Sequence, residues 1–375
     1  MSFSPRTALE TRLIGALQAV VDPLTARDWV STRQVDQLSV EGGQVTLDVT
    51  LGYPAQSQWG AYSELVRQAL MQVDGIEAVS VNWHTKVIAH AVPRGMTLLP
   101  GVKNLVAVAS GKGGVGKSTT AINLALALTA EGASVGMLDA DIYGPSMPLM
   151  MGLSGKPDSP DGKTITPPIK HGIQMMSMGL LVADQAPTIW RGPMATQALD
   201  QLLKLSNWGT PDAPLDYLIV DMPPGTGDIH LSICQRAPLT AAVVITTPQD
   251  IALLDARKGL RMFEKVSVPV LGVIENMAVY HCPQCGHEAH IFGEHGGQRL
   301  ADEGQVRLLG SLPLDLKIRE QADSGCPTLV SDPDSRPAQL YRDIARQMAA
   351  GLSLLPKDYS AKMPGVAVIS PPAGQ

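Results

Sequence analysis

The sequence contains little of what marks membrane-spanning, secreted or nucleic-acid-binding proteins. No apolar stretch approaches the ~20 consecutive residues that a helix needs to cross a bilayer. Four cysteines in 375 residues are too few for a disulfide scaffold, which indicates a reducing, cytoplasmic compartment. Lysine and arginine form no run, and the formal net charge of −6 argues against a general nucleic-acid binder. We therefore expect neither a membrane nor a nucleic acid among the partners.

The amino-terminal stretch lacks the separate apolar segment and cleavage site of a signal peptide. Charged side chains interrupt it at Arg6, Glu10 and Arg12. Its apolar residues fall on one face of a helix: Leu9, Leu13, Ile14, Leu17, Val20 and Val21. The pattern predicts an amphipathic helix packed on a core. Because proline disfavours helix in the residue before it, this helix should end near Asp22–Pro23.

Alternating and helical patterns in residues 1–93 predict a small α+β domain. Polar and apolar residues alternate along Gln44–Leu51 and Val79–Trp83, as in strands with one buried face. Between these two segments, Ser63–Val73 carries apolar residues at helical spacing. Proline and glycine are frequent in residues 94–103, which indicates a linker.

Beyond the linker, residues 104–350 contain short runs of consecutive apolar residues. Strands buried on both faces have this composition, and they occur in parallel sheets covered by helices on both sides. The runs are Leu105–Ala109, Val135–Leu138, Tyr217–Val220, Ala242–Ile245 and Val270–Ile274. Helical stretches such as Thr119–Ala130 separate several of them. The predicted fold class is α/β, with a doubly wound, mostly parallel sheet preceded by the small α+β domain. Residues 351–375 should form a disordered tail, since proline, glycine, alanine and serine dominate its end.

A complete phosphate-binding loop follows the first apolar run. Residues Gly111–Ser118 match GxxxxGK[ST] between an apolar strand and an apolar helix, the context that such a loop requires. Glycines let successive backbone N–H groups face the phosphates of ATP, and the helix N-terminus adds a positive end. The Lys117 ammonium should neutralise the β- and γ-phosphates, and the Ser118 hydroxyl should ligate Mg²⁺. The predicted nucleotide-binding residues are Gly111, Gly113, Gly114, Val115, Gly116, Lys117, Ser118 and Thr119.

Acidic residues end two of the predicted strands. Asp139 and Asp141 follow Val135–Leu138, and Asp221 follows Tyr217–Val220. Open α/β sheets bind ligands at the carboxyl ends of their strands, so these carboxylates should lie beside the phosphate loop. An aspartate there holds the Mg²⁺ shell or orients the attacking water. The alternative for each, taken alone, is an ordinary turn aspartate that caps a helix.

A second motif, Cys282-Pro-Gln-Cys285-Gly, is typical of a metal centre. Two thiolates two residues apart on a turn can hold one metal centre from one side. The other cysteines, Cys234 and Cys326, are isolated, which favours structural roles. The missing ligands could come from the same loop of a second copy, and a two-fold dimer would then build a four-thiolate site suited to [4Fe–4S].

Two other interpretations of this motif stay open on spacing alone. The turn resembles a zinc knuckle, and His281, His287 or His290 could complete a zinc site within one chain. A redox-active or inert CxxC is the remaining alternative, although the thioredoxin-like strand–helix setting is missing.

As an ordered set, the motifs resemble those of the Mrp/ApbC family of iron–sulfur cluster carrier ATPases. The resemblance covers about Asn104–Ala350 and rests on KGGVGKST, DADIYGPS, WRGPM (Trp190–Met194), DMPPGTGD and CPQCG. The loop itself is similar to the deviant Walker A loop of the nitrogenase iron protein and MinD group. The first segment resembles the small domain often fused before this ATPase. Stand-alone versions can carry a reactive cysteine in the loop that here reads Leu51–Ser57. No cysteine occurs in this segment, so we expect docking and not cluster ligation there.

The resemblance implies roles for further residues. Lys112 would reach across a dimer interface and stabilise transition-state charge at the partner's nucleotide. Asp141 would be the first-switch aspartate near the γ-phosphate, and Asp221 the Walker B residue that contacts Mg²⁺ through water. The expected catalytic set is therefore Lys112, Lys117, Asp141 and Asp221. Asn276 and the backbone just beyond Pro313 would recognise adenine.

The implied function is that of an iron–sulfur cluster carrier that binds ATP and hydrolyses it slowly. A homodimer would hold a [4Fe–4S] cluster between the loops of Cys282 and Cys285, receive it from upstream scaffold proteins and pass it to apoproteins in the cytoplasm. A MinD/ParA-like positioning ATPase is the first alternative; it explains the phosphate loop and Lys112 but not CPQCG. A zinc-stabilised, nucleotide-dependent scaffold is the second.

Overall fold

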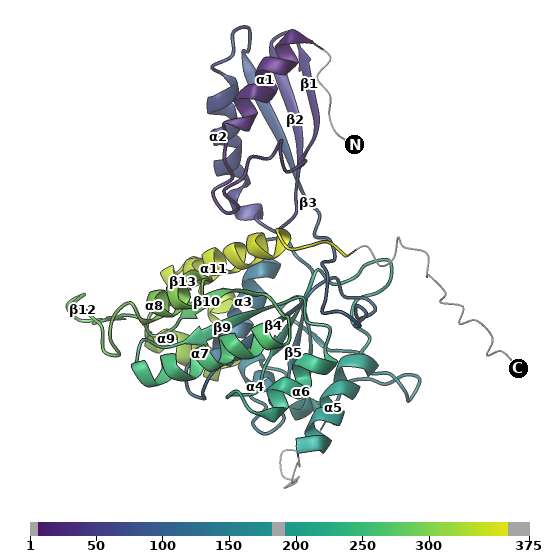
Figure 1. Cartoon of the computed structure of the whole chain (residues 1–375), viewed down its shortest axis with the longest axis vertical. Coiled ribbons are helices and arrows are strands. Elements are labelled where there is room, and N and C mark those ends of the chain that lie inside the picture. The colour runs from purple at the N-terminus through teal and green to yellow at the C-terminus, as the bar shows by residue number, and fades with distance from the viewer. Residues whose placement is uncertain (1–6, 182–191, 359–375) are drawn as a thin grey trace, which may run out of the picture.

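The chain folds into an α/β domain that carries a small α+β domain at one end (Figure 1), and the predicted fold class is confirmed. The structure is a computed structural model and describes residues 7–181 and 192–358. The predicted tail begins too early: residues 351–353 are the last residues of helix α11 (Arg336–Ser353), and Leu352 is buried. From position 359 onwards the tail lies outside the described residues. We keep 1–93, 94–103 and 104–350 as the proposed domain limits.

The small domain packs two helices against one face of a three-stranded sheet. The strand order is β1-β2-β3, with β2 antiparallel to β1 and parallel to β3. Side chains of β2 alternate between buried and less buried positions, as predicted. Trp29, Tyr62 and Trp83 form the aromatic centre of the core, with ring centroids 5.2 to 5.7 Å apart. The elements are α1 (Ala8–Gln18), β1 (Val35–Glu41), β2 (Gln44–Leu51), a short 3₁₀ helix (Gln56–Gln58), α2 (Trp59–Leu70) and β3 (Ala78–Thr85).

Two predictions for this domain need correction. The first helix ends at Gln18 and not near Asp22, because Val21 leaves the helix to bridge Asp28 and is 51% exposed. The Asp22 carboxylate is buried and accepts hydrogen bonds from the Tyr53 hydroxyl (2.7 Å) and the Leu24 N–H (2.9 Å). Burial and the nearby Asp22 raise the pKa of Tyr53 far above its usual value. The second helix begins at Trp59 and ends at Leu70, so it is shifted towards the amino terminus.

The α/β domain is built on one eight-stranded sheet. Its order is β13-β10-β9-β4-β8-β5-β7-β6, and all pairs are parallel except β6 with β7. The five predicted apolar runs form the five consecutive strands from β10 to β5 in this order. The strands are β4 (Leu105–Ser110), β5 (Val135–Asp139), β6 (Ile169–Lys170), β7 (Ile173–Ser177), β8 (Tyr217–Asp221), β9 (Ala241–Thr246), β10 (Val270–Glu275) and β13 (Arg307–Ser311).

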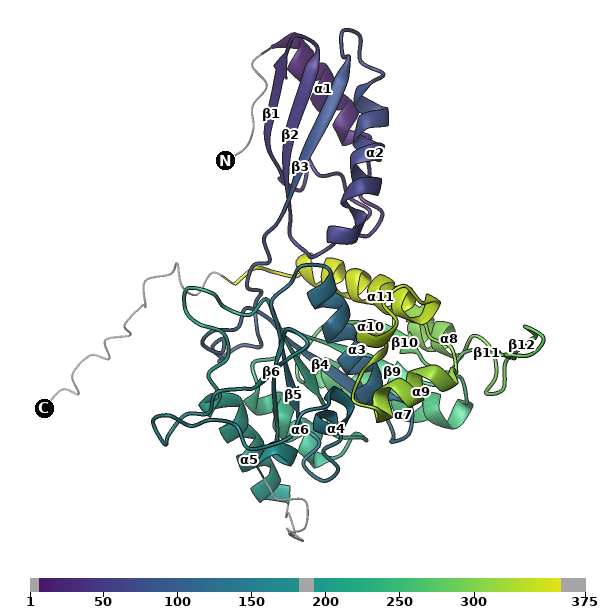
Figure 2. The ribbon, with the colours of Figure 1, turned by 180° about the vertical axis from the view of Figure 1, so that it is seen from behind.

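Helices cover both faces of this sheet, as Figures 1 and 2 show from opposite sides. Alternate residues of β4 point into two different cores. Val106 and Val108 pack with α3 and α11, in a core that continues into the small domain, whereas Leu105 and Ala107 pack with α5, α6 and α7. The helices are α3 (Lys117–Ala130), α4 (Met147–Met151), a 3₁₀ turn (Met178–Leu180), α5 (Gly192–Leu205), α6 (Asp228–Arg236), α7 (Asp250–Lys265), α8 (Gly296–Glu303), α9 (Leu316–Asp323), α10 (Thr328–Ser331) and α11 (Arg336–Ser353).

A buried ionic cluster joins the two domains where the helix that starts at the phosphate loop ends. Glu131, the C-cap of α3, is fully buried, and its carboxylate accepts hydrogen bonds from the Ser57 N–H (2.9 Å) and hydroxyl (2.7 Å) of the small domain. The Arg346 guanidinium of α11 donates to the same carboxylate at 2.6 Å and to the Ser57 hydroxyl at 2.9 Å. The Leu51–Ser57 loop of the small domain therefore contacts the α/β domain through a satisfied network of buried charges.

Removal of Glu131 should destabilise the protein strongly. We expect Glu131→Ala to cost about 3–5 kcal/mol, because Arg346 would remain buried with only the half-exposed Asp343 as counter-charge. Urea unfolding and limited proteolysis of the segment between β3 and β4 would measure the loss. Glu303→Ala is the matched control, since it removes the partner of the more exposed Arg257 and should change little. A double variant, Glu131→Leu/Arg346→Met, should recover much of the loss; equal stability of Glu131→Ala and wild type would contradict this role.

Candidate functional site

The phosphate loop lies between β4 and α3, at the carboxyl edge of the sheet. Gly114 and Gly116 adopt positive φ angles of 80° and 78°, which places them in the left-handed region and lets the loop curl around a central space. Close packing adds a second demand on two glycines. A Cβ on Gly111 would lie 2.2 Å from the Asp255 carbonyl carbon, and one on Gly116 would lie 2.3 Å from Asn276 Nδ2. The loop therefore has the geometry that the sequence motif predicts.

The Lys117 ammonium and the Ser118 hydroxyl meet at one carboxylate. Lys117 Nζ lies 2.6 Å from Asp221 Oδ1, and the Ser118 hydroxyl donates to Asp221 Oδ2 at 2.6 Å. Asp221 is the last residue of β8, which pairs with β4. Because the phosphate loop follows β4, the order of the strands brings Asp221 next to Lys117 and Ser118. A hydroxyl and a carboxylate oxygen so close together suit Mg²⁺, which prefers oxygen ligands and keeps several waters. Ser118 and Asp221 would hold the ion there.

Two carboxyl groups are buried side by side at this edge. Asp139 and Asp221 are register partners on β5 and β8. Burial, and then the charge of Asp221, raises the pKa of Asp139 to about 7. Burial also raises the pKa of Asp221, and the Lys117 ammonium opposes that shift. A cation or bound Mg²⁺ is needed to keep two such carboxylates charged together.

The predicted switch aspartate lies just beyond this pair. Asp141 N–H donates to Asp139 Oδ1 at 3.1 Å, and Asp141 Oδ1 accepts from the Gly144 N–H at 3.2 Å. Asp139 also accepts from the Ser177 hydroxyl at 3.0 Å, so it holds the segment after β5 in place. The sequence predicts Asp139 only as one of the carboxylates beside the phosphate loop, because it is the last residue of an apolar strand; its role in holding this segment follows from these contacts.

Lys112 lies on the loop without a fixed counter-charge. Its carbonyl oxygen accepts from the Ser110 hydroxyl at 2.8 Å, and its half-buried side chain forms no ion pair with any residue that the structure describes. The ammonium is therefore available to an external anion, which is compatible with the predicted role in trans.

His230 is a further residue that the sequence analysis missed. It is buried, and its Nε2 donates to the Pro223 carbonyl oxygen at 2.6 Å, which ties the start of α6 to the segment after β8. Burial lowers the pKa of His230 below its usual value, so the ring is neutral at physiological pH. The sequence signal was only its place two residues after DMPPGTGD, which does not distinguish it from other helical histidines.

The two predicted adenine-side residues lie next to each other across neighbouring strands. Asn276 follows β10 and is buried; its Nδ2 donates to the Val115 carbonyl oxygen of the phosphate loop at 2.8 Å. Pro313 follows β13 and is also buried. The segments pair through the Leu312 N–H, which donates to the Glu275 carbonyl oxygen at 2.8 Å. Both residues therefore border the phosphate loop side of the sheet.

Cys282 and Cys285 lie on a small hairpin, here called the CxxC hairpin (residues 280–289). Its strands β11 (Tyr280–His281) and β12 (Glu288–Ala289) are antiparallel. The turn closes with Cys282 N–H donating to the His287 carbonyl oxygen and Gly286 N–H to the Cys282 carbonyl oxygen, both at 2.9 Å. Backbone N–H groups of Cys285 and Gln284 lower the pKa of the Cys282 thiol, which favours the thiolate that binds metals.

The described part of the chain brings no third ligand to this hairpin. His281 Nδ1 faces Glu288 at 3.4 Å, and His290 Nδ1 donates to the Ala278 carbonyl oxygen at 2.9 Å. Across residues 7–181 and 192–358, no three His, Cys, Asp or Glu side chains gather to hold a metal ion. Cys234 is buried in α6, where burial raises its pKa to about 12, and Cys326 lies beyond α9, so neither joins the hairpin.

Other parts of the chain bear less on the site. Trp190 and Arg191 of the predicted WRGPM motif lie outside the described residues.

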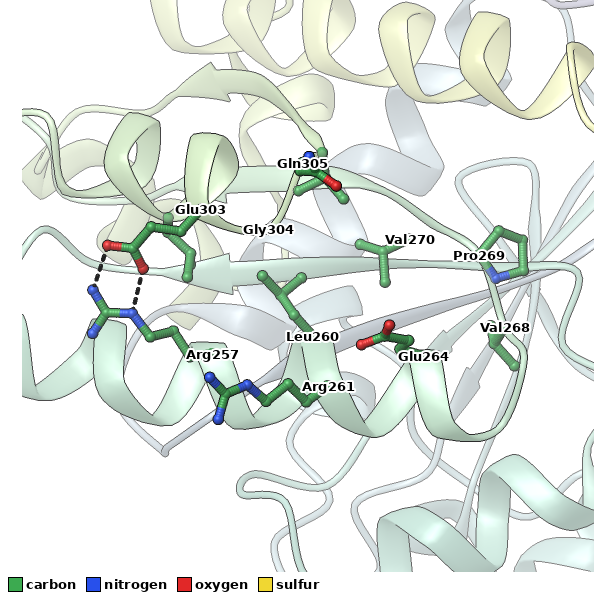
Figure 3. A pocket seen from close by; sticks show the side chains of 12 residues that line it. Arg257, Leu260, Arg261, Glu264, Val268, Pro269, Val270, Glu303, Gly304 and Gln305 are labelled. Carbon is green, nitrogen blue, oxygen red and sulfur yellow. Dashed lines mark hydrogen bonds and ion pairs between the residues drawn. The ribbon is translucent and has the colours of Figure 1, made fainter.

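A groove of about 510 Å³ between α7 and α8 (Figure 3) is lined by the Arg257–Glu303 ion pair and by residues 268–270 at the amino end of β10. Ligands of open α/β sheets bind at the carboxyl ends, so this groove is not the nucleotide site. Within the described ranges, no helix combines the length and apolarity needed to span a bilayer.

The fold and the phosphate loop together define the class of this protein. It is a P-loop NTPase with a mostly parallel sheet. Two family models match the chain. The model described as NUBPL iron-transfer P-loop NTPase matches residues 101–349, and the model described as iron–sulfur cluster assembly protein matches residues 10–83. The chain belongs to the NUBPL iron-transfer P-loop NTPase family, and the resemblance drawn from its motifs is confirmed.

Curated relatives extend this match over nearly the whole chain. The iron–sulfur cluster carrier protein of Pseudomonas fragi is 51% identical over 77% of this chain and 100% of its own length. The iron–sulfur cluster carrier protein of Escherichia coli is 44% identical over 92% of this chain and 93% of its own length. Among solved structures, a nucleotide-binding protein of Archaeoglobus fulgidus in complex with ADP is 34% identical, with a TM-score of 0.52 over 60% of this chain and 87% of that one.

Proposed function

We propose that this chain carries an iron–sulfur cluster between the CxxC hairpins of two copies and delivers it to apoproteins. ATP binding and slow hydrolysis at the phosphate loop drive the cycle. The relatives named as cluster carriers support the carrier role. The proposed cluster is [4Fe–4S], held by Cys282 and Cys285 of each chain, and the proposed compartment is the cytoplasm. Upstream scaffold proteins would supply the cluster.

One observation carries the proposal: among the described residues, no third His, Cys, Asp or Glu side chain gathers with the two thiolates of the hairpin. Cys285 is exposed and Cys282 half-buried, so both can meet a second chain. A [4Fe–4S] cluster takes four thiolates, and a two-fold axis beside the hairpin would supply the other pair. For a zinc site within one chain, His281 and His290 face other groups, and among the described residues neither they nor His287 form a group of three ligands with the cysteines. A positioning ATPase would leave the hairpin unexplained.

A shared active site follows from the same dimer. We propose that Lys112 acts on the partner's nucleotide, with Lys117, Asp141 and Asp221 acting within the chain. Lys112→Ala should keep ATP affinity and lower kcat about 10³-fold, as loss of an arginine finger does elsewhere. Phosphate release at saturating ATP and binding of a fluorescent ATP analogue would measure the two quantities.

Mixing two inactive variants tests whether Lys112 acts across the interface. In a mixed dimer of Lys112→Ala with Asp141→Ala, one of the two sites has an intact lysine from its partner and an intact aspartate of its own. An equimolar mixture that exchanges subunits should regain about a quarter of the wild-type rate, since half the dimers are mixed. Lack of any recovery, with mixed dimers demonstrated by mass, would place Lys112 in its own site.

The carrier role is tested by transfer to an apoprotein that needs [4Fe–4S] for activity. Reconstituted protein should activate it at a rate that differs between ATP and a non-hydrolysable analogue, both with Mg²⁺. Cys326→Ala is the control and should transfer normally. Equal rates in all nucleotide states would remove ATP hydrolysis from the cycle, and no transfer at all would refute the carrier role.

A further inference from the structure

Two segments, here called roots, hold the CxxC hairpin in place, and only the first of them leads into the hairpin along the chain. The first root is the segment from Asn276 to Val279, which leads from β10 into β11. Asn276 Nδ2 donates to the Val115 carbonyl oxygen at 2.8 Å, and its backbone N–H donates to the Thr246 carbonyl oxygen at 2.8 Å. The distance in sequence from Asn276 to Cys282 is six residues. One side chain, Asn276, therefore joins the phosphate loop to the start of the hairpin.

The residue after Asn276 has the backbone of a hinge. Met277 adopts a φ of 57°, which costs a non-glycine residue free energy unless the surroundings hold it. Its N–H donates to Asn276 Oδ1 at 2.9 Å, so the same side chain that contacts the phosphate loop also holds this turn. The Asn276 side chain thus joins the nucleotide site to the hinge.

The second root is the segment that follows β13; it is not continuous with the hairpin but pairs with the first root. Ala278 N–H donates to the Leu312 carbonyl oxygen at 2.9 Å, and Leu314 N–H donates to the Val279 carbonyl oxygen at 2.8 Å. Pro313 lies in the sequence between Leu312, which accepts the first of these hydrogen bonds, and Leu314, which donates the second. A third tie, from His290 Nδ1 to the Ala278 carbonyl oxygen at 2.9 Å, closes the far strand of the hairpin onto its own root.

Space beside the hairpin allows it to move. A cavity of about 590 Å³ separates Tyr280, His281 and Cys282 from α9 and the start of α11. The hairpin itself has only two residues in each strand, and its turn residues are exposed except for Cys282. The hairpin is therefore fixed by hydrogen bonds at its base, while its exposed turn has space beside it.

We propose that the nucleotide state of the phosphate loop sets the position of the CxxC hairpin through Asn276, the Met277 hinge, the Leu312–Leu314 pairing and the hydrogen bond from His290 to the Ala278 carbonyl oxygen. The device regulates how accessible the two thiolates are to a cluster or to a cluster acceptor. This inference rests on the proposed function for its biological meaning. The mechanical link itself belongs to the metal-free chain.

Alkylation of metal-free protein tests the link independently of any cluster. Rates of iodoacetamide addition to Cys282 and Cys285, measured by mass spectrometry, should change about fivefold or more when Mg²⁺ and a non-hydrolysable ATP analogue bind, in the range of ordinary coupling energies. His290→Ala should bind the analogue with wild-type affinity but reduce this change to less than about twofold. His287→Ala is the matched control, because His287 lies on the exposed turn and should keep the full change.

Hydrogen exchange gives a second measurement that needs no variant. Bound analogue should alter protection of the Ala278 and Leu314 amides, which form the root hydrogen bonds. Equal alkylation and equal exchange with and without bound nucleotide would overturn the proposal. A full response in His290→Ala would overturn the assigned path. Failure to bind iron would refute the carrier role and leave these results standing, so the two failures are distinguishable.

Discussion

Lys117→Ala should lower ATP affinity about 100-fold or more, the largest effect expected on nucleotide binding. Its ammonium is buried and already lies 2.6 Å from Asp221, so it is positioned and desolvated before ATP arrives. Truncation of a buried, hydrogen-bonded charge partner costs about 2–5 kcal/mol, which is the basis of this figure. Calorimetric titration with ATP and Mg²⁺ measures the affinity.

The control must separate lost binding from lost folding. Lys103→Ala removes a less buried lysine–aspartate pair of similar length, Lys103 Nζ to Asp216 Oδ1 at 2.7 Å, away from the phosphate loop. It should keep wild-type affinity. Thermal unfolding of both variants shows whether Asp221 tolerates the loss of its partner. Wild-type ATP affinity in folded Lys117→Ala would contradict the assignment of the phosphate loop.

Cys285→Ala alone should abolish cluster binding as completely as the double variant Cys282→Ala/Cys285→Ala. In a two-fold dimer each single substitution removes two of the four thiolates, since both chains carry it. The two thiolates that remain in the dimer cannot hold a [4Fe–4S] cluster, which takes four. Absorption near ~400 nm after anaerobic reconstitution, per chain, is the measurement.

Two other cysteines provide controls within the same chain. Cys234→Ala and Cys326→Ala should keep the full absorption, because Cys234 is buried in α6 and Cys326 lies beyond α9. A Cys285→Ala protein that retained half the wild-type iron would show that one chain suffices for the site. That result would contradict the shared hairpin.

The parts of the site that the sequence predicts are those encoded by short, contiguous patterns. The phosphate loop needs glycines at fixed spacing between a strand and a helix, and the structure has Gly114 and Gly116 in the left-handed region as that motif requires. The central strands are equally local, because burial on both faces demands continuous apolar runs. The edge strand β1 has only Leu38 fully buried, and so it carries no such pattern.

Contacts between distant segments could not be predicted in this way. Glu131 forms hydrogen bonds with Ser57, which is 74 positions away in the sequence, and with Arg346, which is 215 positions away. None of the three residues belongs to a recognisable motif. The pairing of Leu314 with Val279 likewise depends on how β13 lies against β10, not on local composition. Spacing also left zinc open at the CxxC motif, and only the hairpin geometry shows that His281 and His290 face other partners.

The most direct test of the account is the metal content and mass of the protein after anaerobic reconstitution. Iron, sulfide and zinc are quantified per chain, and sedimentation gives the oligomeric state in the same samples. The account predicts about four irons and four sulfides per two chains, in a dimer that dissociates when the cluster is removed. One tight zinc per monomer with no iron uptake would contradict it, and the protein would then be a nucleotide switch with a structural metal.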